Sequence, residues 1–481
     1  MNQKTNNLPI VIVLLTGTFI AILNQTLLTT AIPHIMNDLK IDANMAQWLT
    51  TAFLLVNGIM IPITAFLIEK FTTRKLFISA MSLFAIGTLI CATAPSFPVI
   101  IIGRVIQAAG AGIVMPLMQT VFILIFPKDK RGSAMGMVGL VIAFAPAIGP
   151  TLSGWIVDNY AWETIFYILL PFTLINIGFA YFILRNVTEQ TNPKVDVLSI
   201  ILSSIGFGGI LYGFSVAGGS GWGSMEVLSA FFVGGLSLFL FIWRQLHLPH
   251  PILEFRVFQY KIFTLSTVIG MILFMAMLGA ATIMPMYMQN MRHFSAMESG
   301  MMLLPGAIAM GILSPVTGKI FDKIGPKILS VVGLSLVTLT SILMTNLTES
   351  TPFLYMSIVY AFRMMGLGIV LMPITTAGLN VLPRHLIPHG TAMNNTMRQI
   401  AGSIGTALLI TIMTQGAHTA ANAPSTELAM IHGVNLAFVA STIISAVGLI
   451  LTFFIQKDDS NRYLKEKKQK LSNKVAFAQN K

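Results

Sequence analysis

Two arginines lie inside long apolar runs of the sequence, and they are its first candidates for chemistry. Arg104 and Arg363 each stand near the start of such a run and are followed by small residues. A charge within a membrane span is costly and by default marks a functional site. Asn24 and Arg104 lie at similar depths, so we expect Arg104 to meet Asn24 or Gln25 across a helix bundle. The alternative is an arginine that extends outward and caps helix carbonyls.

Acidic residues are the usual partners of such arginines, but all 17 of them fall in loops or at the ends of apolar runs. Proton coupling commonly uses a carboxylate whose pKa is raised by burial, and none here is deeply embedded. Asp158 and Glu163, five residues apart at the outer mouth, are candidates for proton exchange, with solvated loop acids as the alternative. The missing deep carboxylate favours neutral or weakly basic substrates over permanent cations.

Other chemistries lack the residues they need. The single cysteine, Cys91, lies in an apolar run, which excludes a disulfide framework and a cysteine metal cage. His385 and His389 have the spacing of a metal pair, but Pro388 lies between them, and we expect a solvated loop. The sequence contains no phosphate-binding loop of the ATPase type. We therefore predict no enzyme, no metal and no cofactor, and an ion gradient or a partner as the energy source.

The elements that must position these residues are long apolar helices. Of the 481 residues, 55% are hydrophobic and 10% are charged, whereas soluble chains carry about 25% charged residues. This composition excludes a soluble enzyme, a nucleic-acid-binding surface and a disordered chain. A helix that spans a bilayer needs roughly 20 apolar residues. Fourteen such runs occur, at about 8–33, 48–68, 76–95, 98–121, 133–156, 163–184, 197–217, 225–243, 262–288, 300–321, 327–345, 352–378, 392–415 and 432–456.

The basic residues indicate the orientation of these spans. Twenty-five of the 29 lysines and arginines fall on the side of the N-terminus, and only Lys40 and Arg292 fall on the other. Positive residues mark the cytoplasmic side, so we expect both termini in the cytoplasm of a plasma-membrane protein. The net charge of +12 is then mainly a topology signal. The basic tail, 457–481, either lies near anionic lipid or is a solvated end.

The first part of the sequence recurs in its second part. Pro62 and Pro315 are 253 residues apart, and Arg104 and Arg363 are 259 apart. Six spans plus two extra separate the copies, which gives them parallel topology. We therefore predict an all-α membrane fold of two six-helix bundles, 1–195 and 261–456. Two inserted spans at 196–260 separate the bundles, and the tail at 457–481 follows the second bundle.

Several segments then support a family resemblance: Leu23–Thr26 with Thr29–Pro33, Ala65–Lys75 with its second copy Gly318–Lys327, Gly103–Gly112, Pro146–Gly154 and Gly390–Gly405. They resemble motifs of the major facilitator superfamily, and specifically of its fourteen-span drug:proton antiporter branch (the EmrB/QacA-like family). The resemblance implies that Arg104 takes part in proton transfer and that the segment around Gly149 marks an exporter. Asn24 departs from the pattern, because the branch has an acidic residue there.

Charged residues at the inner ends of the spans, and small residues within the span at 133–156, are candidates for conformational gating. We expect ion pairs of Glu69 with Arg74 and of Asp322 with Lys327, which form in one transport state and break in the other. The alternatives are anchoring at lipid headgroups and ordinary helix packing. The remaining gating candidates are Lys70, Gly149, Pro150, Gly154, Gly318 and Lys323.

A methionine-rich segment is a candidate wall of the substrate path. Residues 271–310 hold 11 of the 30 methionines, and flexible methionine surfaces suit promiscuous binding. The alternative is lipid-facing or core packing. The candidates for the substrate path are Gln107, Gln119, Met284, Tyr287, Met288, Gln289, Arg363, Asn394, Asn395 and Arg398.

These patterns and the resemblance together predict a secondary exporter for multidrug efflux. It moves amphipathic toxic compounds or antibiotics outward by alternating access, as an antiporter with protons. The alternatives are a dedicated exporter of a metabolite, an amino acid or a lipid, and a transporter-like sensor that moves nothing. Its expected partners are small amphipathic molecules, protons and the lipid bilayer, without nucleic acid. The sequence leaves the oligomeric state open.

Overall fold

The computed structural model describes residues 7–191, 193–420 and 425–455, and these residues form helices without any β-strand. Fourteen of the helices are long and apolar enough to cross a membrane. In chain order they are α1 (Leu8–Leu39), α2 (Ala43–Lys70), α3 (Thr73–Ala92), α4 (Phe97–Ile125), α5 (Arg131–Asn159), α6 (Thr164–Ile183), α7 (Val197–Ser220), α8 (Met225–His247), α9 (Lys261–Met286), α10 (Ala296–Ile324), α11 (Pro326–Leu343), α12 (Phe353–Asn380), α13 (Ile387–Thr419) and α14 (Thr426–Thr452).

This count confirms the fourteen predicted spans, although most of the helices extend beyond their predicted ends. Pro33 lies inside α1 instead of ending it. A proline within a membrane helix removes one backbone donor, and neighbouring helices can satisfy the freed carbonyl. Pro388 stands in the first turn of α13, where its missing N–H has no intrahelical partner in any case. The predicted solvated loop around His389 is therefore wrong, and His389 is a buried helical residue.

Short polar side chains begin several of these helices. Asp42 accepts a hydrogen bond from the backbone N–H of Met45 at the start of α2. Ser295 and Glu298 form a reciprocal capping box at the start of α10. Such caps satisfy backbone donors that the first turn of a helix leaves free. The polar breaks in the sequence thus define where the apolar runs begin.

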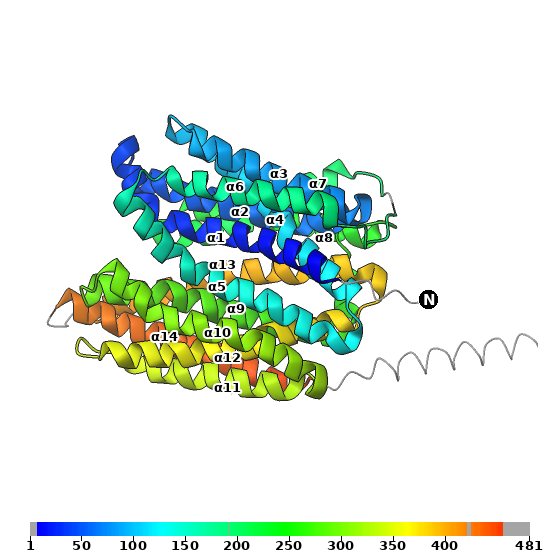
Figure 1. The fold of residues 1–481 in the computed structure, drawn as a ribbon. Coiled ribbons are helices and arrows are strands. Elements are labelled where there is room, and N and C mark those ends of the chain that lie inside the picture. Colours follow the sequence, from blue (N-terminus) through cyan, green and yellow to red (C-terminus); the bar gives the residue numbers. More distant parts are fainter. Residues whose placement is uncertain (1–6, 192, 421–424, 456–481) are drawn as a thin grey trace, which may run out of the picture.

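The helices form two six-helix bundles with parallel repeat symmetry, plus two inserted helices. We call α1–α6 the N-half and α9–α14 the C-half. In Figure 1, α1–α4 lie in the upper group, α9–α12 and α14 lie in the lower group, and α5 and α13 lie between them. The two halves meet where α5 packs along α10 and α2 packs along α13. The exact domain boundaries at 195, 260 and 456 remain a prediction, and the basic tail lies outside the described residues.

The inserted helices α7 and α8 pack against each other, and α7 also packs against α2 and α13. Arg244 at the end of α8 forms an ion pair with Asp196 at the start of α7, with 3.0 Å between Nε and Oδ2. Burial opposes ionisation of this carboxyl, but hydrogen bonds from Arg244 and Ser199 hold the pKa of Asp196 below its usual value. The pair joins the two ends of the inserted hairpin.

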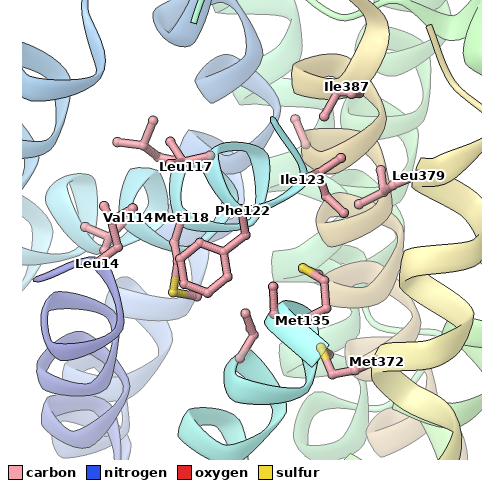
Figure 2. Packing of buried hydrophobic residues seen from close by; sticks show 14 of the residues in the cluster. Leu14, Val114, Leu117, Met118, Phe122, Ile123, Met135, Met372, Leu379 and Ile387 are labelled. Carbon is pink, nitrogen blue, oxygen red and sulfur yellow. The ribbon is translucent and has the colours of Figure 1, made fainter. Parts of the chain in front are cut away.

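Because an even number of helices crosses the molecule, α1 begins and α14 ends on the same side. We call this side the termini face and the opposite side the distal face. Buried apolar side chains from both halves fill the region between the halves near the termini face. Figure 2 shows Ile123 of α4 beside Leu379 of α12 and Ile387 of α13, with Met135 of α5 below them. This packing closes the molecule on the termini face.

Candidate functional site

Arg104 is fully buried in the N-half and joins four of its helices. Its Nη1 donates to Asn24 Oδ1 on α1 and to Gln107 Oε1 on α4, both at 2.7 Å. Its Nε donates to the carbonyl of Leu49 on α2 at 3.1 Å. Gln107 in turn donates to Thr88 on α3 at 2.8 Å. The expected contact between Arg104 and Asn24 is present, and the arginine does not reach outward to cap carbonyls at a helix end.

No acid takes part in this network within the described part of the chain. The guanidinium instead lies over the ring of Phe53, with Cζ 4.1 Å from the ring centre. Asp158 is exposed near the end of α5. Glu163 lies just before α6 and is half-buried, and its Oε2 has no hydrogen-bond partner among the described residues. A role in proton coupling remains a prediction for all five candidates, which are Asn24, Gln25, Arg104, Asp158 and Glu163.

Arg363 is the equally buried arginine of the C-half. Its Nη2 donates to the carbonyl of Ala276 on α9 at 3.0 Å and to Ser441 Oγ on α14 at 3.1 Å, and its Nη1 bonds Ser341 on α11. Like Arg104, it joins helices within one half, and its partners are neutral. It does not line the cavity described next.

A cavity of about 810 Å³ lies between the two halves. That volume falls within the range of sites for drug-sized molecules, about 300–1,000 Å³. Its walls extend over Thr18–Met36 on α1, Gln47–Ile61 on α2 and Asn395–Ile410 on α13, with further residues from α4, α5, α7 and α9. These segments run from the middle of the helices toward the distal face. The cavity therefore ends where the closed packing of the termini face begins.

The cavity walls are mainly apolar and carry a few amides and hydroxyls. Among the predicted substrate-path residues, Asn395 and Arg398 line it, and so does Gln25. Asn394, Gln107 and Gln119 are buried behind the walls. Gln119 of α4 accepts a hydrogen bond from Asn395 of α13 at 2.7 Å, which links the halves just beyond the inner end of the cavity.

The methionine-rich segment lies mostly away from the cavity. Met277 of this segment lines the cavity. Met284, Tyr287 and Met288 belong to a buried apolar cluster inside the C-half, and Gln289 is exposed. The Tyr287 hydroxyl donates to the carbonyl of Thr348 at 2.6 Å. This segment therefore mainly fills the C-half core.

Asp322 makes the most extensive polar contact between the halves. Its Oδ1 accepts from the backbone N–H of Gly132 at 2.7 Å, and its Oδ2 accepts from Ser133 N–H at 2.9 Å and Ser133 Oγ at 2.5 Å. These donors belong to the first turn of α5, where backbone N–H groups lack intrahelical partners and the helix dipole favours a negative charge. A carboxylate of α10 thus caps a helix of the other half.

Glu69 makes a second contact between the halves. Its Oε1 lies 2.9 Å from His389 Nε2 across the boundary between α2 and α13. The backbone N–H of Glu254 donates to His389 Nδ1 at 3.3 Å, so we infer that the Nε2 proton points to Glu69. Nearby, Arg131 of α5 donates to Asn380 of α12 at 2.9 Å. All of these contacts lie on the termini face.

The predicted pairs Glu69–Arg74 and Asp322–Lys327 are absent from this state of the described residues, and their formation in another transport state stays a prediction. Arg74 turns toward α6 instead, and its Nε donates to the carbonyl of Leu184 at 2.5 Å. Lys70 lies over the ring of Phe66 at 5.4 Å. Lys323 and Lys327 are exposed. The two acids face the opposite half because α2 and α10 pack along helices of that half near their ends.

Glycines allow α5 and α10 to approach closely beside Asp322. A Cβ added at Gly318 would lie 2.2 Å from the carbonyl oxygen of Gly132, and one at Gly136 would lie 2.6 Å from that of Ser314. In the N-half, a Cβ at Gly149 would lie 2.2 Å from Thr26 Oγ1, whereas Gly154 faces open space. Pro150 lies inside α5, next to Gly149. Close packing thus holds at Gly149 and Gly318 but not at Gly154.

The family model described as Major Facilitator Superfamily matches residues 14–406 of this sequence. The chain belongs to the major facilitator superfamily. Two solved structures of the superfamily share its fold: human MFSD10, described as an organic anion transporter (TM-score 0.68, 13% identity, 93% of this chain and 100% of that one), and the proton:xylose symporter XylE (TM-score 0.60, 12% identity, 91% and 94%). At such identities the likeness concerns the fold alone.

Bacterial relatives are far more similar in sequence. The MFS-type transporter YcnB of Bacillus subtilis is 54% identical over 95% of this chain and 97% of its own length. The lincomycin resistance protein LmrB of Listeria monocytogenes is 43% identical over 95% of this chain and 98% of its own. The multidrug export protein EmrB of Haemophilus influenzae is 29% identical over 82% and 78%.

Proposed function

We propose that this superfamily member is a multidrug exporter that moves amphipathic compounds out of the cell by alternating access. The observation that carries the proposal is the cavity between the halves, which extends to the distal face and is closed toward the termini face. Support for drugs as cargo comes from the relatives named for lincomycin resistance and multidrug export. Lincomycin is therefore the first compound to test.

We further propose that the termini face is cytoplasmic and that the membrane is the cell membrane. The excess of lysine and arginine on this side supports the orientation. The closed termini face then corresponds to an outward-facing state, in which a substrate leaves toward the outside. The contacts between the halves on this face must break before the cavity opens inward. They are made by Glu69, by Asp322 and by the glycines where α5 and α10 meet.

Inward proton flow is the proposed driving force. Support comes from the position of Arg104 in the distal half of α4, where its contacts with Asn24 and Leu49 join helices that line the cavity. A change in these contacts would move α1 and α2 relative to α4. Glu163 lies near the distal face of the same half and is the acid most suited to receive a proton from outside.

The experiment uses the full chain in inverted membrane vesicles that carry a proton gradient, with a pH-sensitive dye inside. Addition of lincomycin should release protons from the vesicles, and Arg104→Ala should abolish that release. Arg185→Ala, which removes an exposed arginine, is the control and should retain it. Drug uptake that ignores a protonophore would refute the proton half of the proposal. No uptake across a panel of drugs would refute export of drugs and favour a dedicated exporter or a sensor.

A further inference from the structure

The mainly apolar wall of the cavity carries one charged group among its described residues, the side chain of Arg398 on α13. Arg398 lines the cavity and is 1% exposed. It is the only charged residue among the described residues that line the cavity, and no aspartate or glutamate accompanies it there. The charge carried by the described lining residues is therefore positive.

The guanidinium group of Arg398 is only partly satisfied by the protein. Its Nη2 donates to the carbonyl of Leu371 at 3.2 Å and to the hydroxyl of Thr375, and both partners are neutral. Its Nε and Nη1 have no hydrogen-bond partner among the described residues. Removal of a charged donor from water without a partner is unfavourable. A ligand that supplies a hydrogen-bond acceptor to these nitrogens is therefore bound more tightly.

The guanidinium of Arg398 lies between the cavity wall and α9. A Cβ added at Gly270 of α9 would lie 3.2 Å from the Arg398 Nε, so the missing side chain lets the guanidinium lie against α9. Phe274, one turn further along α9, lines the cavity, and its ring centre lies 5.2 Å from the Arg398 Cζ. Asn395 and Gln399 line the cavity on either side of Arg398 in the sequence. An aromatic or aliphatic wall thus adjoins a planar donor group, which matches a carboxylate or another oxyanion.

The other two buried arginines differ from Arg398 in their position relative to the cavity. Arg104 and Arg363 join helices within one half and do not line the cavity. Burial of an arginine in this protein therefore does not by itself create a ligand site. Among the buried arginines that the structure describes, only Arg398 both lines the cavity and keeps two unpaired guanidinium nitrogens.

We propose that Arg398 forms an anion subsite, so that the cavity selects amphipathic organic anions, such as aromatic carboxylates, over cations with the same apolar body. The proposal rests on the proposed function only in treating this cavity as the substrate site. It differs from the sequence-based expectation of neutral or weakly basic cargo, because Arg398 lines the cavity and none of the described acids does.

Three fluorescent probes with one apolar body test this proposal: anthracene-9-carboxylate, 9-anthracenemethanol and (anthracen-9-ylmethyl)trimethylammonium. Binding is measured to the purified full chain in nanodiscs of phosphatidylcholine. A charge-assisted hydrogen bond in a buried site corresponds to about 10- to 100-fold in affinity. We expect the wild type to bind the carboxylate probe at least about 10-fold more tightly than the ammonium probe. Arg398→Gln should abolish this difference in affinity, while the alcohol probe should still bind to the variant.

Two further variants keep the test decisive. Arg363→Gln removes an equally buried arginine away from the cavity and should keep the preference for the carboxylate. Gln399→Glu keeps Arg398 and adds a negative charge to the cavity wall, and it should weaken carboxylate binding even if Arg398→Gln fails to fold. Equal affinities for the carboxylate and ammonium probes in the wild type, or a preference that survives Arg398→Gln, would overturn the proposal.

A lipid headgroup is a second source of the same chemistry. Nanodiscs with added phosphatidylglycerol distinguish the two sources, because an anionic lipid in the subsite would weaken the carboxylate probe selectively. That result would overturn the proposal of a small-molecule site. The binding measurement needs no transport, so a failure here leaves the vesicle result standing, and absence of transport leaves the binding preference standing.

Discussion

Replacement of Asp322 by alanine offers a direct test of how the termini face stays closed. The carboxylate accepts three hydrogen bonds from the first turn of α5, at 2.5–2.9 Å, and it belongs to the other half of the molecule. Asp322→Ala removes all of these contacts without adding bulk. We therefore expect it to shift the conformational equilibrium from the closed termini face toward the open one.

The size of the shift follows from the contacts. A hydrogen bond to a charged group contributes about 1.5–3 kcal/mol in net terms, and the N-terminus of a helix adds about 0.3–1 kcal/mol for a nearby anion. Asp322 is only half-buried, and water replaces it at the freed donors, so the contributions do not add fully. We expect about 2–4 kcal/mol, which corresponds to about a 30- to 1,000-fold change in the ratio of closed to open molecules.

Distances between paired spin labels measure this ratio. Lys75 at the start of α3 and Ile328 at the start of α11 are exposed, lie on the termini face and belong to different halves. The native cysteine, Cys91, is buried, which favours selective labelling of cysteines placed at these two positions. The wild type should show mainly the short distance of the closed state, and Asp322→Ala should show a major longer distance.

Asp129 provides the matched control. It is an exposed acid on the same face, three residues before Gly132. Asp129→Ala should leave the distance distribution unchanged. An unchanged distribution in Asp322→Ala, or the same change in both variants, would refute the assignment of Asp322 as the contact that holds α5 and α10 together.

Three further predictions follow from the same contacts. Gly318→Ala places a methyl group within 2.2 Å of the Gly132 carbonyl and should open the termini face in the spin-label measurement, whereas Gly154→Ala, which meets open space, should not. His389→Ala removes the contacts to Glu69 and Glu254 and should cost the closed state about 1–3 kcal/mol, while His385→Ala, at an exposed position four residues earlier, should leave the distances as they are. Arg104→Lys keeps the charge but cannot reproduce the guanidinium contacts to Asn24, Gln107 and Leu49; transport of lincomycin should fall at least about tenfold, and wild-type rates in this variant would contradict a role for that geometry.

The spans and the pairing of Arg104 with Asn24 could be predicted because they depend on local patterns. Apolar runs of helical length define the spans, and the depth of each residue within its run follows from the rise per residue. Two polar residues at the same depth in adjacent helices of one half have few other partners. The prediction of their contact needed no knowledge of the other half.

The partners of Glu69 and Asp322 could not be found in the same way. The sequence offers Arg74 and Lys327 as neighbours, whereas the observed partners lie 320 and about 190 residues away. Only the arrangement of the two halves brings them together. The methionine-rich segment shows the same limit, since its composition suits a binding surface but the direction of each side chain depends on tertiary packing.

The three buried arginines together bear on the question of driving force. None of them is paired with a carboxylate among the described residues, so the interior of the protein carries fixed positive charge. Such an interior disfavours cations and favours anions in the cavity beside Arg398. A membrane potential that is negative inside acts on an exported anion with about 2.3 kcal/mol per charge for each 100 mV, in the direction of export. An exporter of anions therefore gains from the potential itself, and the absence of a deeply embedded acid is then compatible with active export.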